Sequence, residues 1–110
     1  MPHIIIEHTK DIAEAVNTHD LNKKLHACLA AQETVKLESV KTRAIPVENA
    51  VVGDGSIEDF VHITVLLLEG RSKELKATMA QNIFNEAQSM LKDVNCALSV
   101  NVDDLGVYQK

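Results

Sequence analysis

Proline at position 2 is the residue of this chain best suited to acid–base chemistry. It directly follows the initiator methionine, and a Met-Pro start is a favoured substrate for removal of the first residue. A mature chain would then begin with the secondary amine of Pro2, a nitrogen base held in a rigid ring. Proline also begins edge strands, where its missing N–H costs nothing, so Pro2 alone has a structural explanation as well.

Two cationic residues, Lys41 and Arg43, lie two apart in a predicted strand. They therefore point to the same face and could present two positive charges to a dicarboxylate. Arg43 is the better carboxylate ligand, because its planar guanidinium can form a bidentate pair, and Lys41 is the weaker electrostatic partner. The competing explanation is that both are solvated cations on an edge strand.

Arg71 stands just before a long predicted helix. Free N–H groups at a helix N-terminus already favour anions, so an arginine there could hold a substrate carboxylate or act as a cation beside Pro2. A cation at this end opposes the helix dipole by about 0.3–1 kcal/mol, which suggests a role other than helix stability. The alternative is a solvated arginine in a turn.

These residues together could transfer a proton within a substrate that carries carboxylates. The reaction needs one base that accepts and returns a proton, and cations that hold carboxylates and stabilise the enolate. An ordinary α-amino group has a pKa near ~7.7–8.0, so only about a tenth of it is unprotonated at pH 7. Burial and neighbouring guanidinium groups would lower that pKa, so we expect a cation next to Pro2.

The histidines and cysteines carry weaker signals. His3 and His62 are predicted to be strand residues that face a neighbour. Loop or helix-surface positions suit the other three, His8, His19 and His26. His26 and Cys28 point apart on a predicted helix, so we expect no metal site. The isolated Cys28 and Cys96 are expected to be reduced thiols.

The first half of the chain, about residues 1–52, reads as strand, helix, strand. The β-branched run at 3–7 predicts a strand, and a single helical turn follows it. Asp20 then precedes an amphipathic stripe of leucines that predicts a helix ending near Ala31. A second strand is expected within 37–47.

The same order returns at about residues 57–110, after a glycine-rich turn. A strand is predicted from Phe60 to Leu68, then a long helix capped by Ser72, then a closing strand at 96–102. We therefore predict a single α+β domain, residues 1–110, whose duplicated β-α-β units form a four-stranded mixed sheet. The right-handed crossover rule places its two helices on one face.

The strands are apolar on both sides, which predicts a sheet buried on both faces. Because the chain has no further elements to cover the second face, we expect a homo-oligomer whose sheets pack together. The net charge of −5, the absence of a basic run and the presence of only three aromatic residues argue against nucleic acid as a partner. No apolar run is long enough to span a membrane, and no secretory signal is recognisable, so we expect a cytoplasmic protein.

Several segments resemble the 5-carboxymethyl-2-hydroxymuconate isomerase family of the tautomerase superfamily. They are Met1–Glu7, Val40–Arg43 and Phe60–Thr64, followed by Gly70–Ser72. The likeness spans most of the chain. The segment Leu68–Lys76 also resembles the strand-to-helix segment of the 4-oxalocrotonate tautomerase subunit, which is half as long and agrees with a duplicated unit.

The resemblance implies a homotrimer with inward-facing sheets, an amino-terminal proline base, and cofactor-free isomerisation of an unsaturated oxo acid. It also implies a role in the bacterial breakdown of homoprotocatechuate and related aromatic acids. Pro2 would shuttle the proton while Arg71 and Arg43 bind carboxylates; Lys41 stands where the family commonly has an arginine.

Two other functions are compatible with the sequence: a tautomerase of another oxo acid, such as phenylpyruvate, or a non-catalytic oligomeric binding protein. In a molecule that keeps Met1, the Pro2 nitrogen is an amide without a basic lone pair.

Overall fold

The computed structural model describes residues 1–110 and places all four strands in one sheet. The strands are β1 (His3–Thr9), β2 (Lys41–Val47), β3 (Asp59–Leu67) and β4 (Cys96–Asp104). Their order is β2-β1-β3-β4. The outer pairs β1/β2 and β3/β4 are parallel, and the central pair β1/β3 is antiparallel. This is the predicted four-stranded mixed sheet.

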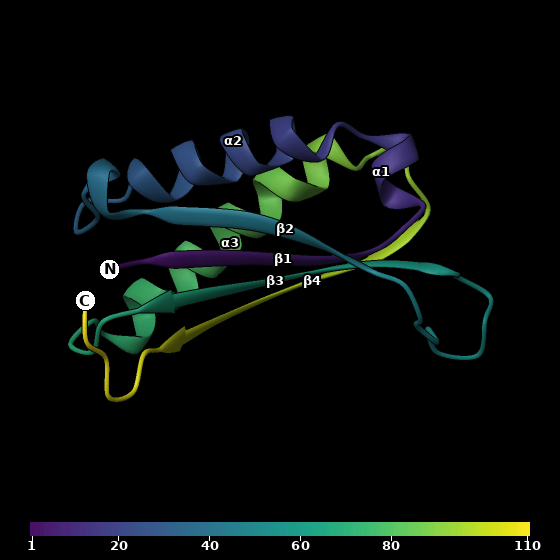
Figure 1. The fold of residues 1–110 in the computed structure, drawn as a ribbon. Helices are drawn as coiled ribbons and strands as arrows, with labels where there is room; N and C mark the ends of the chain where they lie inside the picture. The colour runs from purple at the N-terminus through teal and green to yellow at the C-terminus, as the bar shows by residue number, and fades with distance from the viewer.

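The two long helices cover the same face of the sheet (Figure 1). They are α2 (Thr18–Ala30), which packs on β2, and α3 (Lys73–Met90), which packs on β4 and on α2. A short helix, α1 (Ile12–Ala15), lies between β1 and α2. Each long helix therefore joins two parallel neighbouring strands, as a β-α-β unit requires.

Side-chain caps set the first residue of both long helices. The Ser72 hydroxyl oxygen accepts a hydrogen bond from the Leu75 N–H at 3.1 Å, as predicted from the sequence. The α2 cap is Asn17, whose Oδ1 accepts from the Asp20 N–H at 3.0 Å. The helix thus begins before Asp20, the residue that precedes its apolar stripe, and Asp20 lies in its first turn.

The second strand lies within the predicted range and begins at Lys41. Residues Leu37–Ser39 form a 3₁₀ turn, in which the Val40 N–H donates to the Leu37 carbonyl at 3.2 Å. Their backbone groups are thus bonded locally, and strand pairing begins only at Lys41. The last strand is longer than predicted, because Asp103 and Asp104 still pair with the end of β3.

The core lies between the sheet and the two long helices. Alternate residues of the central strands point into it, including Ile4, Ile6, Ile63 and Val65, all fully buried. They meet leucines of α2 and the middle of α3 in one continuous cluster. Burying an aliphatic side chain of this size contributes about 1.5–3 kcal/mol, so the central strands form a firm platform.

The opposite, open face of the sheet is mixed in character. Ile5 and Leu66 lie on it in the central strands, but β2 contributes Lys41 and Arg43. The expectation that the strands are apolar on both sides is therefore wrong for the outer strands, whose alternation brings polar and charged residues outward.

Three smaller expectations are also answered by the structure. His8 is a buried strand residue rather than a loop or helix-surface residue, and its Nδ1 lies 2.8 Å from the Thr9 carbonyl oxygen. Cys28 and Cys96 are free thiols, as predicted, and burial raises the pKa of each. None of the helices combines the length and apolar character that crossing a membrane requires.

Candidate active site

Pro2 lies at one end of the sheet, where β1 and β2 begin and β3 ends. It is buried, and its carbonyl oxygen accepts a hydrogen bond from the Lys41 N–H at 3.0 Å. The C-terminal tail returns to the same end, because the Leu105 N–H donates to the Leu67 carbonyl at 2.7 Å. The two chain ends consequently lie close together (Figure 1).

Cations surround the start of the chain. Burial is the largest cause that lowers the pKa of the Met1 amine, and the positive charges of Lys110, Lys41 and Arg71 lower it further. Two of the predicted substrate-binding cations are therefore close enough to act on this amine. Removal of Met1 would transfer the amine to Pro2, one residue further in, where the chain is already buried.

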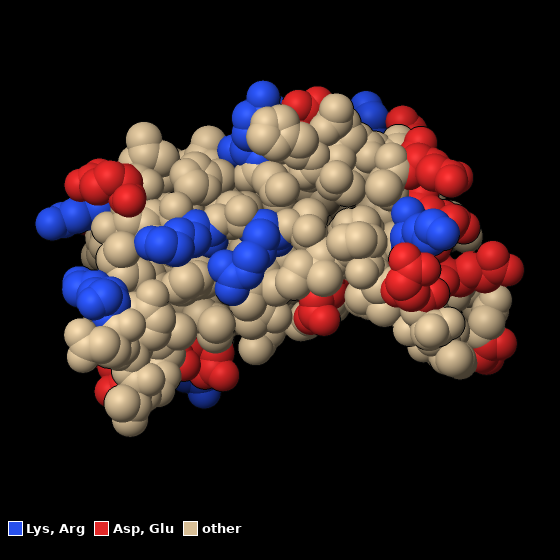
Figure 2. All heavy atoms as spheres, in the orientation of Figure 1, with Lys and Arg blue, Asp and Glu red and all other residues tan.

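The charge is distributed unevenly along the molecule. Basic side chains gather mainly at the end that holds the chain start, and acidic ones at the far end, around the connection between β2 and β3 (Figure 2). That connection carries Glu48, Asp54 and Glu58. A chain of net charge −5 thus keeps one end that suits anionic ligands.

Arg43 contacts His3 across the open face. Its Nη1 donates to His3 Nδ1 at 3.1 Å, and His3 Nε2 lies 2.9 Å from the Tyr108 hydroxyl oxygen. The Tyr108 and His3 rings also pack edge to face, with centroids 5.8 Å apart. Burial, Arg43, Lys41 and the chain-start amine, in that order, lower the pKa of His3.

Arg71 is held by backbone and side-chain oxygens. Its Nε and Nη2 donate to Thr34 Oγ1 and to the Thr34 carbonyl, both at 2.9 Å, and its Nη1 donates to the Leu68 carbonyl at 3.3 Å. It thereby joins the loop after α2 to the turn after β3. These contacts explain why an arginine lies beside a helix N-terminus even when no ligand is bound. A guanidinium has five N–H groups, so Arg71 still has N–H groups free for a ligand.

Sequence reasoning missed two residues of this cluster, Tyr108 and Lys110, and gave His3 only a structural role. The tail that carries the first two has no periodic pattern, and His3 and Tyr108 are 105 positions apart. The only available signal was that Tyr108 is the single tyrosine of the chain.

Two cavities lie away from this cluster. One of about 530 Å³ lies between α2 and α3 and includes Cys28, and one of about 450 Å³ is lined by His19 and His26 of α2 and by Thr42 of β2, among others. No group of three or more histidine, cysteine, aspartate or glutamate side chains is arranged to hold a metal ion. The charged cluster at the chain start is an open surface in the single chain.

A family model, 5-carboxymethyl-2-hydroxymuconate isomerase, matches residues 2–107. The chain belongs to this family. The resemblance seen in the sequence is confirmed, and the chain is an enzyme of the isomerase class, within the tautomerase superfamily. A comparison with curated proteins finds no significant match.

Solved structures share the fold along nearly the whole chain. A 5-carboxymethyl-2-hydroxymuconate delta-isomerase is 15% identical with a TM-score of 0.90, covering 100% of this chain and 87% of its own. A 5-carboxymethyl-2-hydroxymuconate isomerase from Deinococcus radiodurans R1 is 23% identical with a TM-score of 0.88, covering 99% and 88%. A fused 4-OT symmetric trimer is 19% identical with a TM-score of 0.66, covering 96% and 90%.

Proposed function

We propose that the chain is a cofactor-independent isomerase of a small unsaturated oxo or hydroxy carboxylic acid, with the Pro2 nitrogen as its base. The supporting observation is that burial, followed by the charges of Lys110, Lys41 and Arg71, lowers the pKa of the amine at the start of the chain, which belongs to Met1 here. Together with membership of the family, this favours a neutral amine that accepts a proton near pH 7.

The reaction follows from the groups at this end of the sheet. The neutral Pro2 amine takes the proton of a dienol hydroxyl, the oxygen electron pair forms a C=O bond, and the double bonds shift along the chain of carbons. The resulting ammonium returns the proton to the distant carbon. Atoms and charge balance without an oxidant or a reductant, so no cofactor is required.

The cations are assigned to the substrate carboxylates and the developing oxyanion. Arg43 uses one N–H group on His3, so most of its guanidinium is available for a bidentate contact. Arg71 keeps part of its guanidinium beyond Thr34 and Leu68. Lys41, fully outward on the edge strand, adds charge without the planar fork.

We also propose a homotrimer in which a neighbouring subunit covers the open face and completes the site. The fused 4-OT relative forms a symmetric trimer, and the open face here carries apolar residues such as Ile5 and Leu66 among its polar ones. A role in bacterial breakdown of aromatic acids would follow from such a substrate. A clean monomer in sedimentation at micromolar concentration would contradict the assembly.

An electrophilic substrate mimic tests the base directly. 2-Oxo-3-pentynoate inactivates the structurally related protein Pt0534. The chain beginning at Pro2 should gain the mass of one such molecule, because the amine adds to the conjugated alkyne and its proton moves to the alkyne carbon. Peptide mapping should place the label on Pro2, and a chain acetylated at that nitrogen is the control.

Turnover of variants at Pro2 and Arg71 is the second part of the test. Pro2→Ala leaves a less basic primary amine, and Arg71→Ala removes a charge. Both should slow isomerisation of a muconate or phenylenolpyruvate-type acid. Labelling elsewhere in the chain, together with undiminished turnover in both variants, would overturn the proposal.

A further inference from the structure

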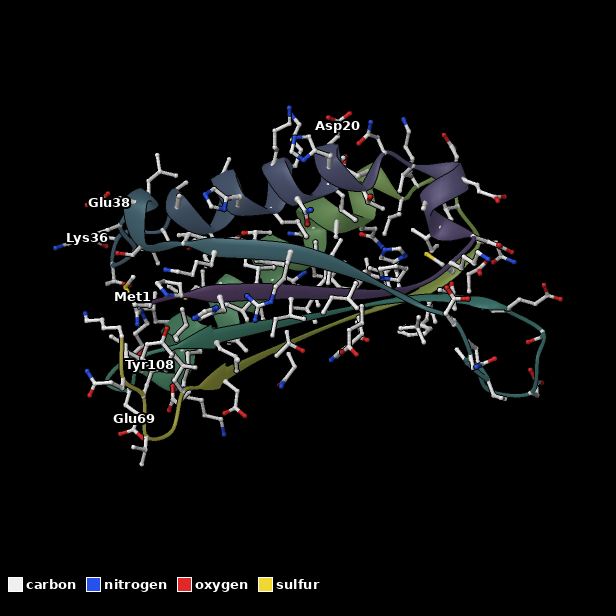
Figure 3. All side chains as sticks on the ribbon, in the orientation of Figure 1. Met1, Asp20, Lys36, Glu38, Glu69 and Tyr108 are labelled. Atoms are coloured by element: carbon white, nitrogen blue, oxygen red, sulfur yellow. The ribbon has the colours of Figure 1, made fainter.

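We propose that the Tyr108 hydroxyl donates a hydrogen bond to the oxyanion that forms on the substrate, and that Arg43 and His3 fix the direction of that O–H. The inference rests on the proposed function, because it assigns a role within the same reaction. Its basis is the line of hydrogen bonds from Arg43 through His3 to Tyr108. Tyr108 lies beside Met1, at the start of the chain (Figure 3).

The direction of each hydrogen bond follows from the chemistry of the groups. A guanidinium has donors only, so His3 Nδ1 must accept from Arg43 Nη1 and carry no proton. The proton of the neutral imidazole is then on Nε2, which donates to the Tyr108 oxygen. That oxygen becomes an acceptor toward His3, and its own O–H is free to point at a third group.

No other protein group bonds to the Tyr108 hydroxyl. The side chain is only half-buried, so its free O–H is accessible to a ligand. A tyrosine hydroxyl is a hydrogen-bond donor that does not form a charged pair with a carboxylate. It can therefore stabilise charge on an oxo oxygen without competing with the arginines for the carboxylates.

The position of Tyr108 suits this role. His3 is the residue that follows Pro2, so a hydroxyl bonded to its ring lies at the same end of the sheet as the proposed base. Lys110, two residues further along the tail, is near enough to the chain start to act on its amine. A substrate held there would meet the base and the hydroxyl together.

The directions of the hydrogen bonds from Arg43 through His3 to Tyr108 depend on a neutral His3. The charged groups that face its ring are Arg43 and Lys41 of β2 and the chain-start amine, all positive, with Tyr108 on the tail. The residue opposite it on β3 is the uncharged Leu66. Protonation of His3 at low pH would place its Nδ1–H against the Arg43 N–H, so the hydrogen bond between the two side chains would be lost.

The competing role for Tyr108 is to anchor the tail by packing on His3. Tyr108→Phe separates the two, because it keeps the ring and removes the hydroxyl. In the full-length chain beginning at Pro2, we expect kcat to fall about 10²-fold, the loss typical of one oxyanion donor, with a far smaller change in KM. Unchanged kcat in a folded variant would overturn the inference.

His3 is a positioning residue, and its effect should pass through the tyrosine. His3→Leu should lower kcat in the wild-type background but change it little when Tyr108 is already phenylalanine. His3→Gln, which retains both a donor and an acceptor, should restore part of the activity. Equal losses from His3→Leu in both backgrounds would contradict this positioning role. Equal losses from His3→Leu and His3→Gln in the wild-type background would also contradict it, and that comparison does not need Tyr108→Phe to fold.

Labelling by 2-oxo-3-pentynoate keeps this inference separate from the proposed function. Tyr108→Phe should still be labelled at Pro2, because the base is intact. Label on Pro2 with wild-type kcat in Tyr108→Phe would overturn the tyrosine role alone. Absence of label on Pro2 in the wild-type chain would instead remove the base on which the inference depends.

Discussion

The two β-α-β units place a histidine at equivalent strand positions and surround it differently. In the first unit, His3 on β1 pairs with Lys41 on β2 and accepts a bond from Arg43. In the second, His62 on β3 pairs with Ser99 on β4, and its Nδ1 lies 2.7 Å from the serine hydroxyl. The same backbone geometry thus supports a cationic cluster in one unit and a neutral contact in the other.

The difference lies in the outer strands. β2 presents Lys41 and Arg43 on the open face, whereas the corresponding positions of β4 hold Ser99 and Asn101. Farther along, β4 carries Asp103. The scaffold thus supplies two similar surfaces on the open face, and the side chains of one edge strand make only one of them attractive to an anion.

The largest effect expected from this comparison concerns Arg43. Arg43→Ala should raise KM for a carboxylate substrate about 10–100-fold, because a hydrogen bond to a charged group contributes about 1.5–3 kcal/mol. Asn101→Ala, its counterpart on β4, should change KM little. Steady-state kinetics of both variants checks this, and equal changes in KM would show that the two edges do not differ as described.

Arg71 tests how the two units are joined. Arg71 belongs to the second unit, but its guanidinium bonds to Thr34 in the first. Arg71→Ala should therefore lower the free energy of unfolding by about 1 kcal/mol and also raise KM. Lys73→Ala, at the start of the same helix, is the matched control. Urea denaturation measures the difference, and an unchanged midpoint would show that the contacts do not stabilise the fold.

The smallest effect is a pH dependence of stability that belongs to His3. Its pKa is lowered in the folded chain from the ordinary 6.5, so stability is full above pH 6.5 and falls as pH drops through the folded value. His3→Asn should lose this part of the pH dependence. Urea denaturation at pH 7.5 and at pH 5 measures it, with His62→Asn as the control from the second unit.

A result in which His62→Asn removed as much pH dependence as His3→Asn would contradict the distinction between the two histidines. Arg43→Ala in the wild-type chain should reduce the same pH dependence, because Arg43 is the largest charged cause of the lowered His3 pKa.

Local sequence patterns were enough to predict much of the fold and part of the candidate site. Strand alternation placed Lys41 and Arg43 on one face, and the Ser72 cap and the order of elements followed from short segments of sequence. Contacts between distant segments were not accessible in this way. Arg71 bonds to Thr34, 37 residues away, and Tyr108 reaches His3 only because the tail turns back at the end of β3.

The ends of two elements were less accessible. α2 begins at Thr18 with Asn17 as its cap, before the apolar stripe by which the sequence located the helix. β4 continues past Val102, because Asp103 and Asp104 still pair with the end of β3. Apolar periodicity gives no signal for polar residues that only backbone hydrogen bonds hold in an element.

The most direct test of the central claim, that the Pro2 amine is the base, compares one chain in two states. A removable leader joined to Pro2 makes its nitrogen an amide, and cleavage directly before Pro2 restores the amine. Turnover should rise about 10²–10⁴-fold on cleavage, the usual contribution of a positioned base, while circular dichroism stays the same. Equal turnover before and after cleavage would contradict the account.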